Sequence, residues 1–102
     1  MDQKDFLNQI KNVVLSYDDK AQVILYGSRA RGDFKKDSDW DILILSKNGD
    51  DYKFQRKLRD NIYDLELEHD QLISTIIMEP GKWQDILITT LYKNVMAEGK
   101  AL

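Results

Sequence analysis

Two aspartates separated by one residue, Asp39 and Asp41, stand at the start of an apolar run that is typical of a β-strand. Alternate side chains of a strand share a face, so both carboxylates point the same way with their Cα atoms roughly 7 Å apart. Carboxylates at this spacing can bind one divalent ion or share two, and paired ions in phosphoryl-transfer sites lie roughly 3.5–4 Å apart. Like charges this close repel each other unless a cation lies between them. The pattern predicts a metal site, although Asp39 could also be an ordinary turn residue.

The pair Gly27-Ser28 is a candidate phosphate-binding turn, because it directly follows the short apolar run at 22–26. Glycine lets the backbone approach a ligand closely. The first N–H groups of a helix that begins near Ser28 attract phosphate oxygens, and the Ser28 hydroxyl can bond one of them. Arg29 and Arg31 add positive charge beside this turn. The alternative is an ordinary turn with a serine N-cap.

The two features lie at the end of one predicted strand and at the start of the next. Strands joined by a short connection are usually neighbours in a sheet. A phosphate-binding turn and a pair of metal-binding carboxylates would then face one cleft. Phosphoryl transfer requires this combination, because a metal neutralises developing charge while amides hold the phosphates.

The composition of the chain excludes several kinds of metal site and of binding partner. The chain has no cysteine and one histidine, His69, so disulfides, thiolate zinc sites and multi-histidine sites are excluded and oxygen ligands favour Mg²⁺ or Mn²⁺. The net charge of −3 argues against a broad basic surface that could bind long nucleic acid. The local basic cluster is large enough to bind one triphosphate, and it consists of Arg29, Arg31, Lys35 and Lys36. No apolar run has the length of a membrane helix or a secretory signal, so we expect a cytoplasmic protein without a membrane partner.

The elements that must position these residues alternate along the chain. The alternation indicates an α/β (α+β) fold, in which helices pack against a small, partly mixed sheet of about three strands or slightly more, and we interpret residues 1–102 as one domain. Apolar periodicity predicts helices over 3–17, 51–66 and from 82 onwards, with a break at Thr89-Thr90, and strands over 22–26, 39–45 and 72–78.

A family resemblance rests on these motifs. Gly27-Ser28, ten intervening residues and Asp39-x-Asp41 resemble the signature of the nucleotidyltransferase superfamily related to DNA polymerase β. The local text GSRARGDFKKDSDWDILIL is similar to its small members, the minimal nucleotidyltransferases, strongly over about residues 22–46 and more loosely elsewhere. The resemblance implies the nucleotidyltransferase fold and Mg²⁺-dependent transfer of a nucleoside monophosphate from an NTP, with ATP expected, to a protein or small-molecule acceptor.

The resemblance also assigns roles to the matching positions. Asp39 and Asp41 would bind the metals and act in catalysis. The residues expected to contact the nucleotide are Gly27, Ser28, Arg29, Arg31 and Ser38.

The chain departs from the family pattern at the third carboxylate, which usually lies on a neighbouring strand. Ser74 stands at the acidic position by alignment, and a hydroxyl is not an ordinary base at neutral pH. Asp70 is the substitute catalytic candidate, because it would share a strand face with Ser74 if the strand started early. Glu68 is a weaker candidate. The alternative is that both acids lie in a solvated turn before the strand. For His69 the alternative is that it has no part in the site.

Expected partners follow from the resemblance. Small family members are often paired with a helical HEPN-domain protein in toxin–antitoxin-like modules. The alternative function is therefore a catalytically weak or inactive nucleotide-binding antitoxin-like partner. With 102 residues we expect no separate acceptor domain, so a docked protein or a second copy of the chain would complete the site.

Overall fold

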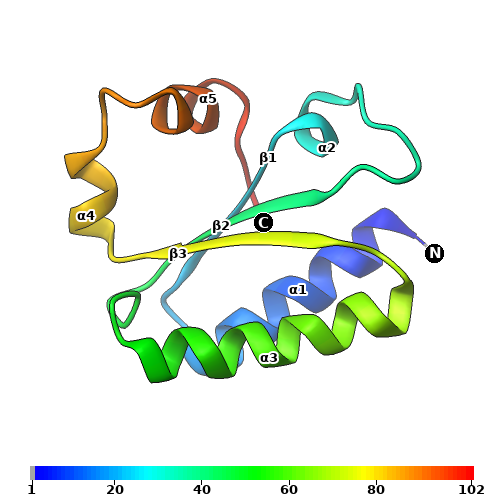
Figure 1. Cartoon of the computed structure of the whole chain (residues 1–102), viewed down its shortest axis with the longest axis horizontal. Helices are drawn as coiled ribbons and strands as arrows, with labels where there is room; N and C mark the ends of the chain where they lie inside the picture. Colours follow the sequence, from blue (N-terminus) through cyan, green and yellow to red (C-terminus); the bar gives the residue numbers. More distant parts are fainter. Residues whose placement is uncertain (1) are drawn as a thin grey trace.

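The computed structural model describes residues 2–102, and its centre is one mixed four-stranded sheet in the order β3-β2-β1-β4 (Figure 1). Strand β1 is antiparallel to both β2 and β4, whereas β2 and β3 are parallel. The predicted mixed sheet is confirmed, and its additional fourth strand is only two residues long. The strands are β1 Gln22–Tyr26, β2 Trp40–Leu45, β3 Ile73–Met78 and β4 Lys100–Ala101.

Within residues 2–102 helix α1 precedes the first strand and four helices connect the strands: α1 Gln3–Tyr17, α2 Ser28–Arg31, α3 Tyr52–His69, α4 Pro80–Asp85 and α5 Thr90–Glu98. The predicted break in the last helical stretch is confirmed, because the Thr89 hydroxyl caps α5 by accepting the Tyr92 N–H at 3.2 Å. Helix α4 begins earlier than predicted, since Pro80 occupies a first-turn position where its missing N–H costs nothing. Strands β2 and β3 each begin one residue later than predicted.

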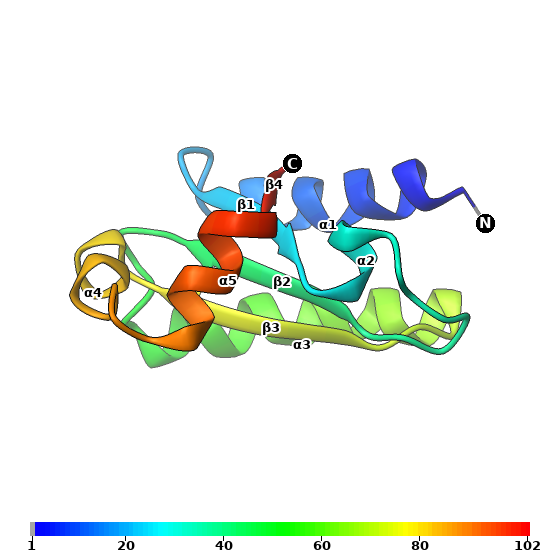
Figure 2. The same ribbon diagram turned by 90° about the horizontal axis from the view of Figure 1, so that it is seen from above.

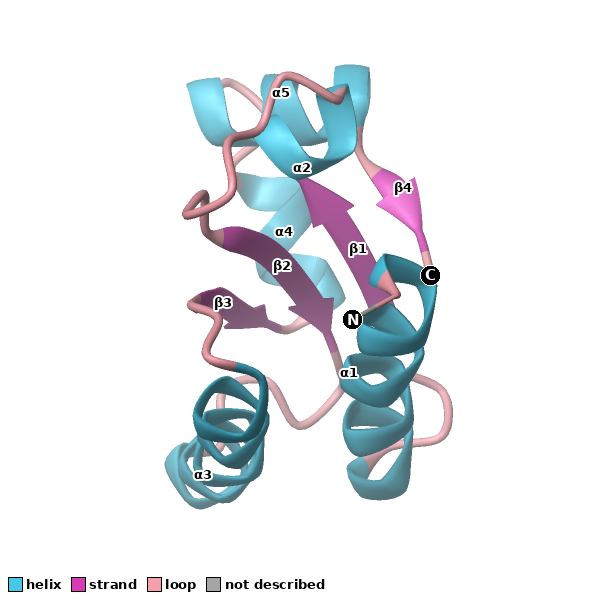
Figure 3. Ribbon diagram, turned by 90° about the vertical axis from the view of Figure 1, so that its right-hand side faces the viewer, coloured by secondary structure: helices cyan, strands magenta, loops and turns pink. Residues whose placement is uncertain are grey.

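The larger hydrophobic core lies between the sheet and the long helices α1 and α3, which both cover the same face (Figures 1 and 3). Strand β2 contributes Trp40, Ile42 and Ile44, all of them buried. These are the residues that alternation predicts for the buried side of the strand. The two helices contribute Phe6, Ile10, Val14, Leu58, Ile62 and Leu65.

The opposite face of the sheet carries a smaller core. Leu43 and Leu45 of β2 pack there against Trp83 of α4 and Val95 of α5. Viewed from above, α5 crosses over this face near β1 and β2 (Figure 2). Asp41 has the parity of Leu43 and Leu45, so its side chain belongs to this second face. None of the helices within residues 2–102 combines the length and apolar character needed to cross a lipid bilayer.

A buried polar contact ties the turn after α1 to the end of β2. The Ser46 hydroxyl donates to an Asp18 carboxylate oxygen at 2.6 Å, and both residues are buried. The other Asp18 oxygen accepts the Lys20 N–H at 3.0 Å. The Ser46 hydrogen bond, followed by the Lys20 one, lowers the pKa of Asp18 because both favour the ionised carboxylate.

We expect Ser46→Ala to lower the free energy of unfolding by about 1–3 kcal/mol, because a buried carboxylate then loses its hydroxyl donor. A carboxylate whose pKa is lowered by folding stabilises the native state above its unfolded pKa, and that contribution is lost as the pH falls through the folded pKa. The difference between wild type and Ser46→Ala in urea melts should therefore shrink below about pH 4. Ser16→Ala is the control, since that exposed hydroxyl bonds only within α1. A difference that is independent of pH would contradict the role of Asp18.

Candidate functional site

The structure brings the glycine turn and the second aspartate into direct contact. Tyr26, the last residue of β1, is paired with Asp41 of β2, and Gly27 follows at once as the N-cap of α2. The backbone of Gly27 has φ 75° and ψ −161°, a conformation that favours glycine. A Cβ at this position would overlap the Asp41 carboxylate. Gly27 is therefore needed both for the turn and for the space that the carboxylate occupies.

The surroundings of Asp41 disfavour the ionised form of its carboxyl group. Burial, then the nearby Asp39 and also Glu98, raise the pKa of Asp41, and Arg31 partly offsets them. Asp39 precedes β2 and is exposed. A bound divalent cation would relieve the repulsion between the two carboxylates.

The donor set fits Mg²⁺ or Mn²⁺, because hard cations of this kind use one or two carboxylates together with substrate phosphates. Within residues 2–102 no three or more His, Cys, Asp or Glu side chains are grouped so as to hold a metal by themselves. The two aspartates beside a glycine turn match a site in which a nucleotide supplies further ligands.

The strands on either side of Asp41 present two hydroxyl groups. Ser74 of β3 is the parallel partner of Asp41, and the family resemblance leads us to expect the third carboxylate at this position. Tyr26 flanks Asp41 from β1, and burial, followed by Asp41, raises the pKa of this phenol. Tyr26 was missed from the sequence because only the cross-strand register brings it next to Asp41.

Asp70 does not lie on the strand. It is the C-cap of α3, with φ 53° and ψ 48° in the left-handed region, and β3 starts only at Ile73. The early strand start on which the candidacy of Asp70 depended is therefore not observed. Glu68 is an exposed residue of α3. His69 bridges two helices, with Nε2 at 3.0 Å from the Gln9 amide oxygen and its ring edge-on to Phe6.

Arg29 holds the loop that leads to the aspartates. It is only 9% exposed, and its guanidinium lies 4.3 Å from the centre of the Trp40 ring and 4.5 Å from that of Phe34. Its Nη2 donates to the Ser38 carbonyl at 3.0 Å and the Lys36 carbonyl at 3.1 Å. Trp40 faces the α1–α3 core, so Arg29 lies across β2 from Asp41. The structure thus gives Arg29 a supporting role in place of the expected phosphate contact.

Ser38 belongs to the same loop. Its hydroxyl accepts the Lys35 N–H at 2.8 Å, and its carbonyl accepts from Arg29. Both groups therefore stabilise the loop that precedes Asp39. Ser38 would contribute to nucleotide binding by holding this loop in place.

We expect Arg29→Lys to lower the free energy of unfolding by about 1–3 kcal/mol, because lysine loses the planar stacking and the forked hydrogen bonds of the guanidinium. Urea denaturation measures the loss. Arg56→Lys, on the exposed side of α3, is a matched control without a recorded side-chain hydrogen bond. If the two variants were equally stable, Arg29 would not hold the loop.

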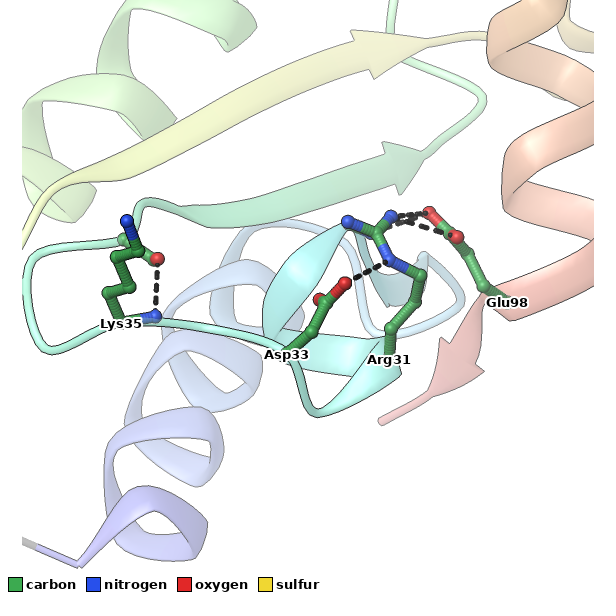
Figure 4. Close-up of polar contacts among 6 residues, drawn as sticks. Arg31, Asp33, Lys35 and Glu98 are labelled. Carbon is green, nitrogen blue, oxygen red and sulfur yellow. Dashed lines mark hydrogen bonds and ion pairs between the residues drawn. The ribbon is translucent and has the colours of Figure 1, made fainter.

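Arg31 lies near enough to Asp41 to act on its pKa, and Figure 4 shows that its guanidinium contacts two other carboxylates. Its Nε donates to Asp33 at 3.3 Å, and its Nη1 lies 3.1 and 3.0 Å from the two Glu98 carboxylate oxygens. One of these oxygens also accepts the Gly27 N–H at 2.9 Å. Glu98 had no signal in the sequence, since it lies 71 residues from Gly27 and outside any motif.

Sheet, glycine turn and aspartate pair are the features expected of a nucleotidyltransferase, and the comparison with known families agrees. A model of the family described as "Nucleotidyltransferase domain" matches residues 7–101. The chain belongs to the nucleotidyltransferase family, an enzyme family, as the signature from Gly27 to Asp41 predicts.

Two curated relatives come from Methanocaldococcus jannaschii. The chain is 39% identical over 74 residues to "Putative protein adenylyltransferase MJ0141", covering 72% of this chain and 73% of that protein. It is 31% identical over 99 residues to "Putative protein adenylyltransferase MJ0604", covering 97% of this chain and 92% of that protein.

Solved structures confirm the fold. A structure described as a minimal nucleotidyltransferase has a TM-score of 0.65 at 21% identity and is matched over 100% of this chain and 97% of its own. A toxin–antitoxin crystal structure with AMP-PNP has a TM-score of 0.65 at 20% identity, over 92% of this chain and 69% of the matched chain. The predicted membership of the nucleotidyltransferase family is confirmed by the family model and the curated relatives, and the solved structures agree in fold.

Proposed function

We propose that this protein is a Mg²⁺-dependent nucleotidyltransferase that transfers the nucleoside monophosphate of an NTP, preferably ATP, to a protein acceptor. The observation that carries the proposal is the contact between the glycine turn and the Asp41 carboxylate. A phosphate-binding backbone and a metal-binding carboxylate next to each other are what phosphoryl transfer requires. The names of the two curated relatives, both protein adenylyltransferases, support the acceptor class.

The residues would divide the work as follows. Asp39 and Asp41 would hold Mg²⁺, which supplies charge neutralisation at the reacting phosphate when bound. The backbone of the Gly27-Ser28 turn and the Ser28 hydroxyl would hold the triphosphate, with Arg31 beside them. Arg29 would fix the loop that delivers Asp39.

A second candidate function is nucleotide binding by an antitoxin-like partner of a HEPN-domain protein, with little or no turnover. Ser74 motivates it, because this hydroxyl occupies the register position next to Asp41 where a third carboxylate is expected. A hydroxyl there leaves the attacking group of the acceptor without an ordinary base. The toxin–antitoxin neighbour with AMP-PNP fits either function.

The test is incubation with Mg²⁺ and ATP labelled at the α-phosphate, together with a helical HEPN-domain protein as the candidate acceptor. Transfer predicts label on the acceptor and release of pyrophosphate. Binding alone predicts a melting-temperature shift that needs both Mg²⁺ and ATP, without pyrophosphate. If neither label nor a melting shift appears, both functions fail.

A further inference from the structure

Glu98 joins the C-terminal end of the fold to the glycine turn. The antiparallel pairing of β1 with β4 matches Leu25 to Lys100, and continuing that register brings Gly27 opposite Glu98. The chain has left the strand at this point, and the Glu98 carboxylate accepts the Gly27 N–H in place of a backbone carbonyl. The Glu98 side chain is only 17% exposed. The sheet edge and the end of α5 therefore fix its position.

The same carboxylate fixes one side of the Arg31 guanidinium. Both Glu98 oxygens lie within 3.1 Å of Nη1, while Asp33 accepts from Nε on the other side (Figure 4). Among residues 2–102, no protein hydrogen bond is recorded for Nη2 of Arg31. The guanidinium is thus held by two carboxylates with one donor nitrogen left for a further partner.

The guanidinium is linked to Asp41 by contacts, because Glu98 binds both Arg31 and the Gly27 N–H, and Gly27 lies against the Asp41 carboxylate. A nucleotide bound at Asp39 and Asp41 would place its phosphates in this region. A planar guanidinium held in advance loses less conformational entropy on binding an anion than a mobile one.

We propose that Glu98 is a positioning residue for the nucleotide, which holds Arg31 and the Gly27 turn so that the free guanidinium nitrogen meets the phosphates. The proposal rests on the proposed function and adds to it a residue that the family motif does not contain. Glu98 acts through Arg31 and does not touch the nucleotide itself.

A purely structural role explains the arrangement less well. The Arg31 side chain is 47% exposed, and ion pairs with so exposed a partner contribute little to stability. Glu98 also adds a negative charge near Asp39 and Asp41, and it is one of the groups that raise the pKa of Asp41. Placing a third carboxylate beside two others costs stability, so its benefit is expected in the orientation of Arg31.

The test uses Glu98→Gln, since the glutamine amide oxygen can still accept the Gly27 N–H while Arg31 loses the negative charge that faces it. The dissociation constant of a non-hydrolysable ATP analogue with Mg²⁺ is measured by calorimetry for wild type, Glu98→Gln, Arg31→Ala and the double variant. We expect Glu98→Gln to weaken binding about tenfold, the size of one charge-assisted hydrogen bond. In the Arg31→Ala background the same change should have no further effect. Asp60→Asn, on the exposed surface of α3, is the control for the loss of one remote negative charge.

Three results would overturn the proposal. Tighter binding by Glu98→Gln would show that the carboxylate competes with phosphate. An equal loss with and without Arg31 would show that Glu98 acts on the fold alone, and unchanged binding would show that it has no role. If wild type itself does not bind the analogue with Mg²⁺, the proposed function fails and this inference with it. All other negative results concern Glu98 only.

Discussion

Replacing Asp41 with asparagine is expected to abolish nucleotide transfer and to raise the melting temperature of the metal-free protein. Transfer should fall by roughly 10²–10⁴-fold, because charge stabilisation by a bound metal is worth several kcal/mol and each 1.36 kcal/mol is tenfold in rate. The rise in melting temperature follows from the site itself, since burial and Asp39 disfavour the Asp41 charge. Opposite signs for activity and stability are typical of a residue retained for function.

The pH dependence of this effect has a defined direction. The pKa of Asp41 is raised by folding, so the protonated carboxyl is favoured in the native state. The stability associated with that proton is present below the unfolded pKa and is lost as the pH rises through the folded pKa. The asparagine side chain of the variant does not ionise, so its stability lacks this dependence. The melting-temperature gain of Asp41→Asn should therefore be largest at neutral pH and should vanish below the ordinary carboxyl pKa of 3.8.

Thermal melts from about pH 3 to about pH 8, a range that includes the ordinary carboxyl pKa, measure the difference in melting temperature between Asp41→Asn and wild type. Asp60→Asn on the exposed surface of α3 is the control, since it removes the same charge far from the site. With Mg²⁺ and ATP the order should reverse, because ligand binding stabilises wild type and not the variant. If Asp41→Asn kept transfer, or lowered the melting temperature of the metal-free protein, the assignment of Asp41 as a metal ligand would be wrong.

The second large effect is expected from Gly27→Ala. The added methyl group would occupy the volume of the Asp41 carboxylate, so either the turn or the carboxylate must move. The positive φ of Gly27 adds backbone strain of about 1–3 kcal/mol for any other residue. Because a displacement of about 1 Å can cost a hundredfold in rate, we expect transfer and Mg²⁺-dependent ATP binding to be lost.

Gly32→Ala is a control for strain at a positive φ without the clash. Gly32 also has a positive φ, 95°, but nothing lies within 4 Å of the position that its Cβ would take. Both variants should therefore lose stability from backbone strain, measured by urea denaturation, and Gly27→Ala should lose more, because φ 75° with ψ −161° is a region that glycine alone readily adopts. Only Gly27→Ala should lose nucleotide binding. Equal losses of binding would mean that strain in the turn, and not contact with Asp41, is the cause.

Much of the fold and half of the site could be predicted from local patterns. Period-two and period-3.6 alternation depends only on residues a few positions apart, so helices α1 and α3 and strands β1 and β2 were expected close to their observed bounds. The glycine turn and the aspartate pair were expected to share a cleft because their strands are neighbours. The two-residue strand β4 could not be expected, since it exists only through its pairing with β1.

The two arginines of α2 show where local patterns end. Arg29 and Arg31 were assigned the same phosphate-binding role from their sequence positions, yet residues two apart on a helix point about 200° away from each other. One guanidinium therefore packs against Trp40 in the core, and the other lies near Asp41. Which one faces the aspartates depends on how α2 sits on the sheet.

The sequence by itself determined the family, the glycine turn and the carboxylate pair, because these lie within 15 consecutive residues that form a turn, a short helix, a loop and the start of a strand. The tertiary structure alone decided what surrounds Asp41. Strand register brings Ser74 and Tyr26 to its sides, and the return of the C-terminal segment to β1 brings Glu98 to Gly27. Such neighbours come from distant parts of the chain, and the packing of the whole sheet brings them together.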